Sequence, residues 1–212
     1  MVELSQIEQG RREICFRLAQ QSFPPRYRRC TIEGWNTKWD LDGATIIRRN
    51  EQIKQIADSY SPQSDAQNSL FFTGRAGMGK THLAAGICFR LAKEGVRSVF
   101  LSWLDFLDNL RSGYHEAKSE ALERLWRDRH VLLLDDLCVV NETPWQAEQL
   151  QRIVERRYSH ELPTIITTNL TVEEIGEKFS PRVESRIHEA YRICEFNGAA
   201  DRRKLKNAEG KK

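Results

Sequence analysis

Five short apolar runs, separated by segments with helical periodicity, dominate the hydrophobic pattern of this chain. The runs lie near residues 69–73, 97–101, 131–135, 164–168 and 191–196. The run at 131–134 contains no polar residue, the form expected of a parallel strand buried on both faces. Strands that alternate with helices form a parallel sheet with helices on both faces. The pattern therefore predicts an α/β fold.

The clearest helical segment follows the first of these runs. Between Thr81 and Lys93, apolar residues recur at spacings of three and four and give the segment one apolar face. Gly95 stands just past the end of this periodic pattern and is a helix stop signal. We therefore expect a strand, a glycine-rich turn and a helix in direct succession.

The glycine-rich turn matches the phosphate-binding pattern G-x-x-x-x-G-K-[ST] at every fixed position. Its residues are Gly74, Arg75, Ala76, Gly77, Met78, Gly79, Lys80 and Thr81. Glycine lets the backbone turn its N–H groups toward an anion, and the next helix adds the partial positive charge of its amino end. We expect Lys80 to reach the β and γ phosphates of ATP and the Thr81 hydroxyl to bind Mg²⁺. His82 is a further candidate for nucleotide contact, although a lone histidine on a helix is more often structural.

Two acidic residues, Asp135 and Asp136, end the third apolar run. The carboxyl end of a buried parallel strand commonly enters an active site, so Asp135 is the expected partner of the magnesium held by Thr81. Asp136 would be the general base that orients a water for attack on the γ-phosphate. An acidic N-cap of the following helix is the alternative interpretation.

A polar amide, Asn169, follows the fourth run. If right-handed crossovers bring the strand ends to one edge, this amide lies beside the γ-phosphate and helps to position the water. Taken alone, it would be only a turn residue.

These motifs, in this order, resemble the AAA+ ATPases of the DnaC, DnaI and IstB group. The motifs are GRAGMGKT, LLLDDL, TIITTNL, SPRVESRI and ADRR, and the segment PPRYRRCTIEGW near residue 24 is similar to the entry of that ATPase domain. The similarity covers residues 23–205. It implies a P-loop sheet of AAA+ type, with ATP and Mg²⁺ as cofactors and hydrolysis to ADP and phosphate, stimulated by DNA or a partner.

The resemblance also implies roles for individual residues. Asn169 corresponds to sensor 1, and Arg186 corresponds to the arginine finger that reaches a neighbour's nucleotide. Arg202 corresponds to the sensor-2 arginine, with Arg203 as a near competitor. Without the resemblance, the segment around Arg186 would be interpreted as a surface helix with salt bridges.

Some features depart from this family pattern. Only 26 residues follow Arg186, so we expect no full helical lid domain. Fewer than 25 residues precede the PPRY motif, where DnaC and DnaI carry a longer module that grips the replicative helicase. Helicase loading is therefore implied less strongly than the ATPase core.

Residues 1–22 predict an amphipathic helix outside the ATPase core. Leu4, Ile7, Ile14 and Leu18 fall on one stripe, which either docks a partner or packs on the chain's own ATPase domain. At the other end, residues 206–212 are expected to form a basic, disordered tail that either tracks a phosphate backbone or is simply solvated. The predicted ATPase domain lies between these segments.

Between the second strand and Asp135, two helical patterns carry basic and aromatic side chains. In the initiator and loader branch of AAA+ proteins, extra helices here line a channel for single-stranded DNA. The candidates for DNA contact are Arg111, Tyr114, His115, Lys118 and Arg124. A solvated helical hairpin with charges of both signs is the alternative.

Composition narrows the remaining choices only slightly. The net charge of +3 identifies no partner, and five scattered cysteines without a C-x-x-C pair suggest neither a disulfide framework nor a zinc site. The absence of an 18-residue apolar run or a signal peptide favours a cytoplasmic protein.

Three functions remain. The first is a helicase-loader-like ATPase that oligomerises with ATP around single-stranded DNA and delivers a replicative helicase during DNA replication. The second is an IstB-like transposition helper that acts with a transposase on duplex DNA. The third is a small-molecule P-loop kinase, which the Asp136, Asn169 and Arg186 series fits less well than hydrolysis by water.

Overall fold

Thirteen elements were traced in a computed structural model that describes residues 2–38, 43–63, 67–111, 130–139 and 143–198. The helices are α1 (Val2–Ser22), α2 (Ala44–Ser59), α3 (Lys80–Lys93), α4 (Trp103–Arg111), α6 (Pro144–Ser159), α7 (Val172–Lys178) and α8 (Pro181–Ala190), with a 3₁₀ turn at Pro25–Tyr27. The strands are β1 (Ser69–Gly74), β2 (Ser98–Ser102), β3 (Val131–Leu137), β4 (Thr164–Thr168) and β5 (Tyr191–Phe196). The five predicted strands and the helix after the glycine-rich turn are therefore confirmed, with bounds that differ by at most two residues.

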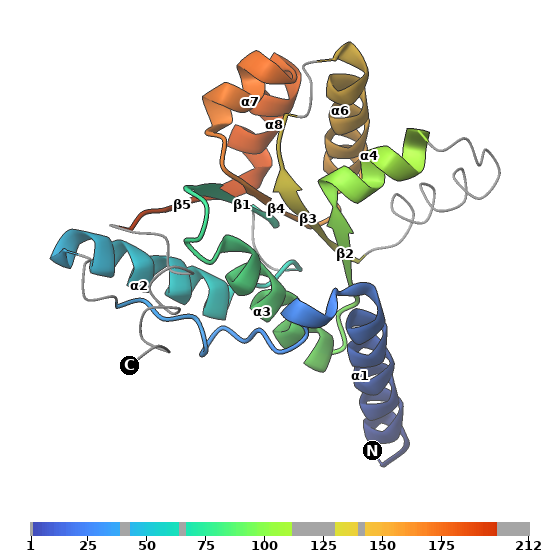
Figure 1. Cartoon of the computed structure of the whole chain (residues 1–212). Coiled ribbons are helices and arrows are strands. Elements are labelled where there is room, and N and C mark those ends of the chain that lie inside the picture. Colours follow the sequence, from blue (N-terminus) through green and yellow to red (C-terminus); the bar gives the residue numbers. More distant parts are fainter. Residues whose placement is uncertain (1, 39–42, 64–66, 112–129, 140–142, 199–212) are drawn as a thin grey trace.

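The strands form one parallel sheet in the order β2-β3-β4-β1-β5 (Figure 1). Because β1 pairs with both β4 and β5, the strand that leads into the glycine-rich turn lies inside the sheet. Its carboxyl end is next to that of β4, and β3 follows on the other side of β4. This order brings the carboxyl ends of β1, β3 and β4 to one edge.

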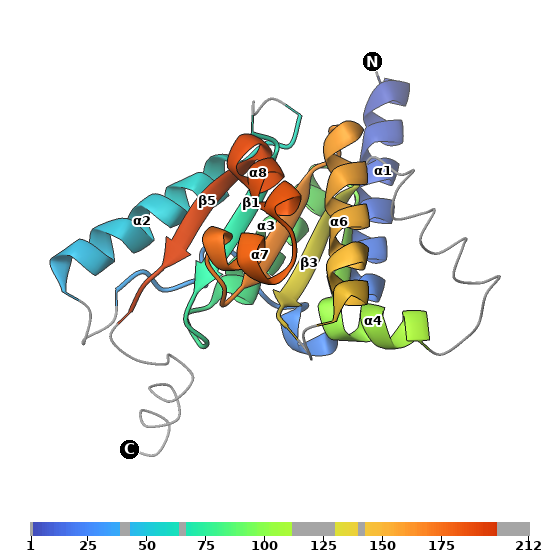
Figure 2. The ribbon, with the colours of Figure 1, turned by 90° about the horizontal axis from the view of Figure 1, so that it is seen from above.

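Helices cover both faces of this sheet (Figures 1 and 2). An apolar cluster packs between the sheet and the helices on each face. Leu70 and Phe72 of β1 pack with α1, α2 and α3, whereas Phe71 packs with α4, α6, α7 and α8. The alternation along β1 follows from the two-residue period of a strand. It explains why β1 carries apolar side chains on both faces, and the helices on both faces of the sheet confirm the predicted α/β fold.

Helix α1 packs on the core through a face that differs from the predicted stripe. Cys15 and Ala19 are buried, and Phe23 just after the helix lies 4.9 Å from the ring of Phe89 on α3. The side chains of Ile7 and Ile14 are 64% and 58% exposed. Small residues let α1 approach the core closely, while part of the apolar stripe faces away from it.

None of the described helices has both the length and the apolar character that a membrane crossing requires.

Candidate nucleotide-binding site

A cavity of about 380 Å³ lies at the carboxyl edge of the sheet, where β1, β3 and β4 end. It brings together Lys80, Thr81, Asp135, Asp136 and Asn169, which come from three separate parts of the sequence. Ala76, Gly77, Gly79 and His82 also line it. The expected meeting of the glycine-rich turn with the two strand ends is therefore seen in the structure.

Lys80 is a buried cation on the wall of this cavity. Its side chain is only 8% exposed, and its ammonium donates to the carbonyls of Gly74 (2.5 Å) and Arg75 (2.9 Å) and to Asn169 Oδ1 (2.8 Å). A buried ammonium needs such acceptors, because burial without hydrogen bonds is costly. The same ammonium is placed to exchange these neutral acceptors for phosphate oxygens, which bind it more strongly.

The turn has the backbone that its glycines allow. Gly79 has a φ of 88°, and a Cβ built there would lie 2.5 Å from Nε1 of Trp35. Gly74 has a φ of 132°, and a Cβ there would lie 2.2 Å from the Phe196 carbonyl oxygen. Both positions are therefore restricted to glycine by backbone angle and by space.

Asp135 is the buried acid of the cavity, with 5% of its side chain exposed. Burial raises its pKa, while hydrogen bonds from Thr167 and Thr81 and the nearby charge of Lys80 oppose that rise. The Thr167 hydroxyl donates to Asp135 Oδ1 at 2.6 Å. The bond between Asp135 and Thr81 joins the two residues that were expected to share a metal ion.

Asp136 has an exposed side chain and an unusual backbone. Its φ is 55°, in the left-handed region that few residues other than glycine adopt. The register between β3 and β4 shifts between Leu134 and Leu137, which marks a bulge at the two acids. Its position at the cavity, exposed to solvent, suits a residue that orients a water.

The donor set fits Mg²⁺ better than a metal held by protein alone. Among the described residues, no three His, Cys, Asp or Glu side chains converge on one point. Magnesium commonly keeps several waters and takes one or two carboxylates together with substrate phosphates. The Thr81 hydroxyl and the Asp135 carboxylate provide such a partial set beside the phosphate turn.

One side of the cavity consists of residues between α1 and α2 that were not predicted to belong to a site. Arg26, Tyr27, Cys30, Gly34, Trp35 and Asn36 line it. Trp35 packs edge-on against Phe196 at 5.5 Å and lies over Gly79, so it covers the glycine-rich turn. The PPRY motif could have indicated this side of the cavity, because it resembles the entry to an ATPase domain.

His82 contacts the segment between α1 and α2 through Nε2, which lies 3.1 Å from the Thr31 carbonyl oxygen.

Thr167 is a further cavity residue that was not predicted from the sequence. Its position two residues before Asn169 could have indicated it, since alternate residues of a strand share a face. Its hydroxyl contacts both acids, as the hydrogen bond from the Asp136 N–H to Thr167 Oγ1 (3.0 Å) shows.

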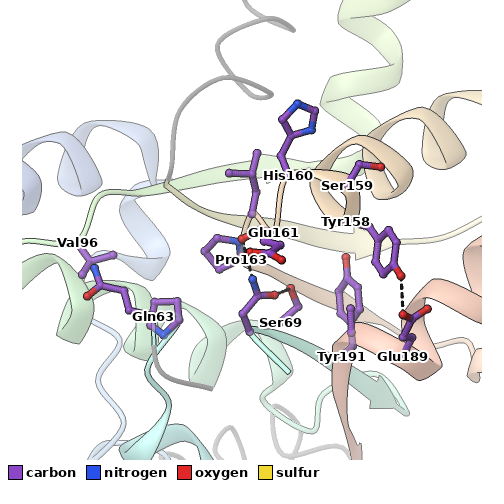
Figure 3. A pocket seen from close by; sticks show the side chains of 14 residues that line it. Gln63, Ser69, Val96, Tyr158, Ser159, His160, Glu161, Pro163, Glu189 and Tyr191 are labelled. Carbon is purple, nitrogen blue, oxygen red and sulfur yellow. Dashed lines mark hydrogen bonds between the residues drawn. The ribbon is translucent and has the colours of Figure 1, made fainter. Parts of the chain in front are cut away.

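Arg186 does not line this cavity. It lies on α8, with its guanidinium 4.5 Å above the ring of Tyr158 and 3.6 Å from Glu189 Oε2. The Tyr158 hydroxyl donates to Glu189 Oε1 at 2.6 Å, on the wall of a separate cavity of about 780 Å³ (Figure 3). Asn68, Ser69 and Pro163 also line that second cavity, which places it at the amino edge of the sheet. Arg186 is thus separated from its own chain's nucleotide site.

The remaining predicted residues lie at the end of α4 or outside the described residues. Arg111 ends α4 with its guanidinium 5.2 Å from the ring of Trp145, and it pairs with Asp108 at 3.8 Å. Arg202 and Arg203 lie outside the described residues, as do the other candidates for DNA contact: Tyr114, His115, Lys118 and Arg124.

Residues 44–193, more than half of the chain, match the family described as IstB-like ATP binding protein. The chain therefore belongs to this family of ATP-binding proteins, and its fold is that of an AAA+ P-loop domain. It is 33% identical over 113 residues to the ATP-binding protein of insertion sequence IS5376 from Geobacillus stearothermophilus, covering 53% of this chain and 45% of the relative. It is 24% identical over 166 residues to the replicative helicase loader DnaC of Escherichia coli strain K12, covering 77% and 64%.

The crystal structure of the DnaC helicase loader superimposes with a TM-score of 0.66 at 25% identity, covering 82% of this chain and all of that one. The predicted family and fold class are thereby confirmed. The matches span about half to two thirds of the length of the relatives.

Proposed function

We propose that this chain is a helicase-loader-like AAA+ ATPase, which hydrolyses ATP, binds single-stranded DNA and delivers a replicative helicase during DNA replication. The observation that carries the ATPase part is the convergence of Lys80, Asp135, Asp136 and Asn169 on one cavity. Membership of an ATP-binding family supports it. The DNA and helicase parts are supported by the likeness to the DnaC loader.

In this proposal each residue of the cavity has a separate role in hydrolysis. Lys80 exchanges its carbonyl partners for oxygens of the β and γ phosphates, and the side-chain amide of Asn169 lies beside the γ-phosphate. Asp136 orients the attacking water and accepts its proton. Thr81 and Asp135 would hold Mg²⁺, which would supply positive charge to neutralise the phosphates.

Arg186 acts from a neighbouring subunit in this scheme. A guanidinium against the γ-phosphate stabilises the charge that develops in the transition state. Its distance from the cavity of its own chain, which it does not line, favours an action in trans over one in cis. The chain would therefore form an ATP-bound oligomer, and each active site would be completed by the next copy.

The α1 helix supplies a candidate partner surface. Ile7 and Ile14 are exposed and lie seven residues apart, on one side of a helix whose other side packs on the core. We assign this pair of side chains to docking of the partner protein. Because Cys15, Ala19 and Phe23 belong to the core, removal of the whole helix would also damage the ATPase domain.

A transposition helper is the second candidate. The family is named for IstB, and the relative from insertion sequence IS5376 is more similar in sequence than the DnaC loader over a shorter region. In that case the partner is a transposase and the DNA is duplex.

One experiment separates the candidates. The purified chain is mixed with the replicative helicase of its own host, with the transposase of a neighbouring insertion sequence, or with neither. Transfer of protein onto labelled single-stranded or duplex DNA is then measured with ATP, with ADP and with the Ile7→Asp/Ile14→Asp variant. Helicase transfer to single strands that needs ATP and the two isoleucines supports the loader. Transposase-dependent binding to duplex supports the helper, and no transfer with either protein contradicts both.

A further inference from the structure

We propose that Thr167 is a positioning residue for ATP hydrolysis, because its single hydroxyl fixes both acids at the end of β3. The inference rests on the proposed ATPase function, in which Asp135 binds magnesium and Asp136 orients water. Thr167 itself lines the cavity but is placed to act through the two acids.

The Thr167 hydroxyl donates one hydrogen bond and accepts another, each with a different acid. A hydroxyl has one proton to donate and two lone pairs to accept with. The Thr167 proton goes to Asp135 Oδ1 at 2.6 Å, and the hydroxyl oxygen accepts the Asp136 N–H at 3.0 Å. Thr167 is 1% exposed, so bulk water does not replace either bond. One side chain thus holds the carboxylate of the first acid and the backbone of the second.

The bulge makes this bridge important for the site. In a regular strand, consecutive residues point to opposite faces, so Asp135 and Asp136 would not share a cavity. Here both acids line the same cavity, because the backbone turns at Asp136 into the left-handed region where the β3–β4 register shifts. A bulge re-aims a side chain in this way, and it leaves ladder groups in need of other partners. The Thr167 hydroxyl is the partner of the Asp136 N–H.

The same strand also reaches the phosphate turn. Asn169 lies two residues after Thr167, and its Oδ1 accepts a hydrogen bond from the Lys80 ammonium at 2.8 Å. The segment from Thr167 to Asn169 therefore contacts the lysine that would bind phosphate and the two acids that would direct hydrolysis. Loss of the Thr167 hydroxyl should leave nucleotide binding to the turn while it releases the acids.

The test compares two substitutions at one position. Thr167→Val keeps the branched shape and removes both hydrogen bonds, and Thr167→Ser keeps the hydroxyl. Ser98→Ala removes another buried hydroxyl, which lies on the edge strand β2 and donates to the Cys88 carbonyl of α3, and it controls for a general effect of such a loss. Steady-state ATP hydrolysis gives kcat and KM. Exchange of the Asp136 amide proton, measured by NMR without nucleotide, gives a readout that does not need activity.

Thr167→Val should lower kcat by about 10- to 100-fold with KM changed by less than about threefold, the size seen when groups that orient metal ligands are removed. Its Asp136 amide should exchange at least about tenfold faster than in the wild type, because its acceptor is gone. Thr167→Ser and Ser98→Ala should stay near wild type in both measurements. If Thr167→Val does not fold, Thr167→Ala removes the same hydroxyl with less crowding and takes its place.

Two results would overturn the proposal. One is a kcat in Thr167→Val that equals that of Thr167→Ser, and the other is an Asp136 amide that exchanges at the wild-type rate without the hydroxyl. A wild-type protein that binds but never hydrolyses ATP would instead overturn the proposed function, and the exchange measurement would still decide whether Thr167 holds the bulge.

Discussion

The ammonium of Lys80 lies 2.8 Å from the side-chain oxygen of Asn169, although the two residues are 89 positions apart in the sequence. The contact joins the amino end of α3 to the carboxyl end of β4. It is possible because β4 pairs directly with β1, the strand that leads into the glycine-rich turn. The lysine expected to contact phosphate thus meets the amide expected to position a water.

Lys80→Ala should weaken ATP binding by about 10- to 100-fold, since charge-assisted hydrogen bonds to phosphate are lost. Titration calorimetry measures the affinity. Lys93→Ala is the matched control, because Lys93 is an exposed residue at the other end of the same helix. Equal affinity in Lys80→Ala and wild type would show that the nucleotide binds elsewhere.

Arg186→Ala should bind ATP normally and lose hydrolysis by about 10³- to 10⁵-fold if it acts as an arginine finger. Mixing it with Lys80→Ala should restore part of the activity, because each variant supplies what the other lacks. Arg182→Ala, four residues earlier on α8 and exposed, is the control. Absence of any recovery across a full range of mixing ratios would argue against an action in trans.

Gly74→Ala should destabilise the fold by about 2–4 kcal/mol, because both a positive φ and a backbone clash oppose a Cβ. Gly10→Ala should instead stabilise it by about 0.5–1 kcal/mol, since a Cβ on this part of α1 meets no atom within 4 Å. Urea unfolding of both variants measures the difference. A neutral Gly74→Ala would mean that the turn and Phe196 are not packed as described.

Stability should fall above pH 9 through two buried thiols. Burial raises the pKa of Cys88 and of Cys194 to about 12, whereas an unfolded thiol ionises near its ordinary value of 9.0. A raised pKa in the folded state gives stability that is present below pH 9 and lost as the pH rises toward 12. Each thiol should therefore cost about 1 kcal/mol of unfolding free energy between pH 9 and 10.

Urea unfolding at the two pH values provides the measurement. Replacement of Cys88 by Ala should remove the part of the loss in unfolding free energy that this thiol causes. Replacement of the partly exposed Cys138 should change the pH dependence of the unfolding free energy less. If the unfolding free energy falls equally between pH 9 and pH 10 in Cys88→Ala and wild type, the raised pKa of Cys88 is contradicted.

The sheet, and the position of the glycine-rich turn beside Asp135 and Asn169, could be predicted from the sequence. Strands covered by helices on both faces are mainly apolar or β-branched, and parallel strands bring their carboxyl ends to one edge. Both rules depend on local pattern and chain order alone. They were sufficient for β1, β3 and β4.

The unpredicted features depend on contacts between distant residues. The bulge at Asp136 and its bond to Thr167 need the register of β3 against β4, which no single segment contains. Trp35 lies over Gly79 because a segment before α2 folds back on the turn. In α1, the stripe that contains Ile7 and Ile14 left open whether it packs on the ATPase domain, because the face that does pack is set by the close approach of Cys15 and Ala19 to the core.

The most direct test of the account is a paired measurement of ATP binding and phosphate release in wild type and Asp136→Asn. The variant keeps Lys80, Thr81 and Asp135, so its affinity for ATP with magnesium should stay within about threefold of wild type, and its rate of phosphate release should fall by about 10²- to 10⁴-fold, the usual contribution of a general base. Single-stranded DNA and the partner protein are included, so that slow unstimulated turnover does not mask the difference. Phosphate release at the wild-type rate from Asp136→Asn would contradict the assignment of this cavity as a hydrolytic site directed by Asp136.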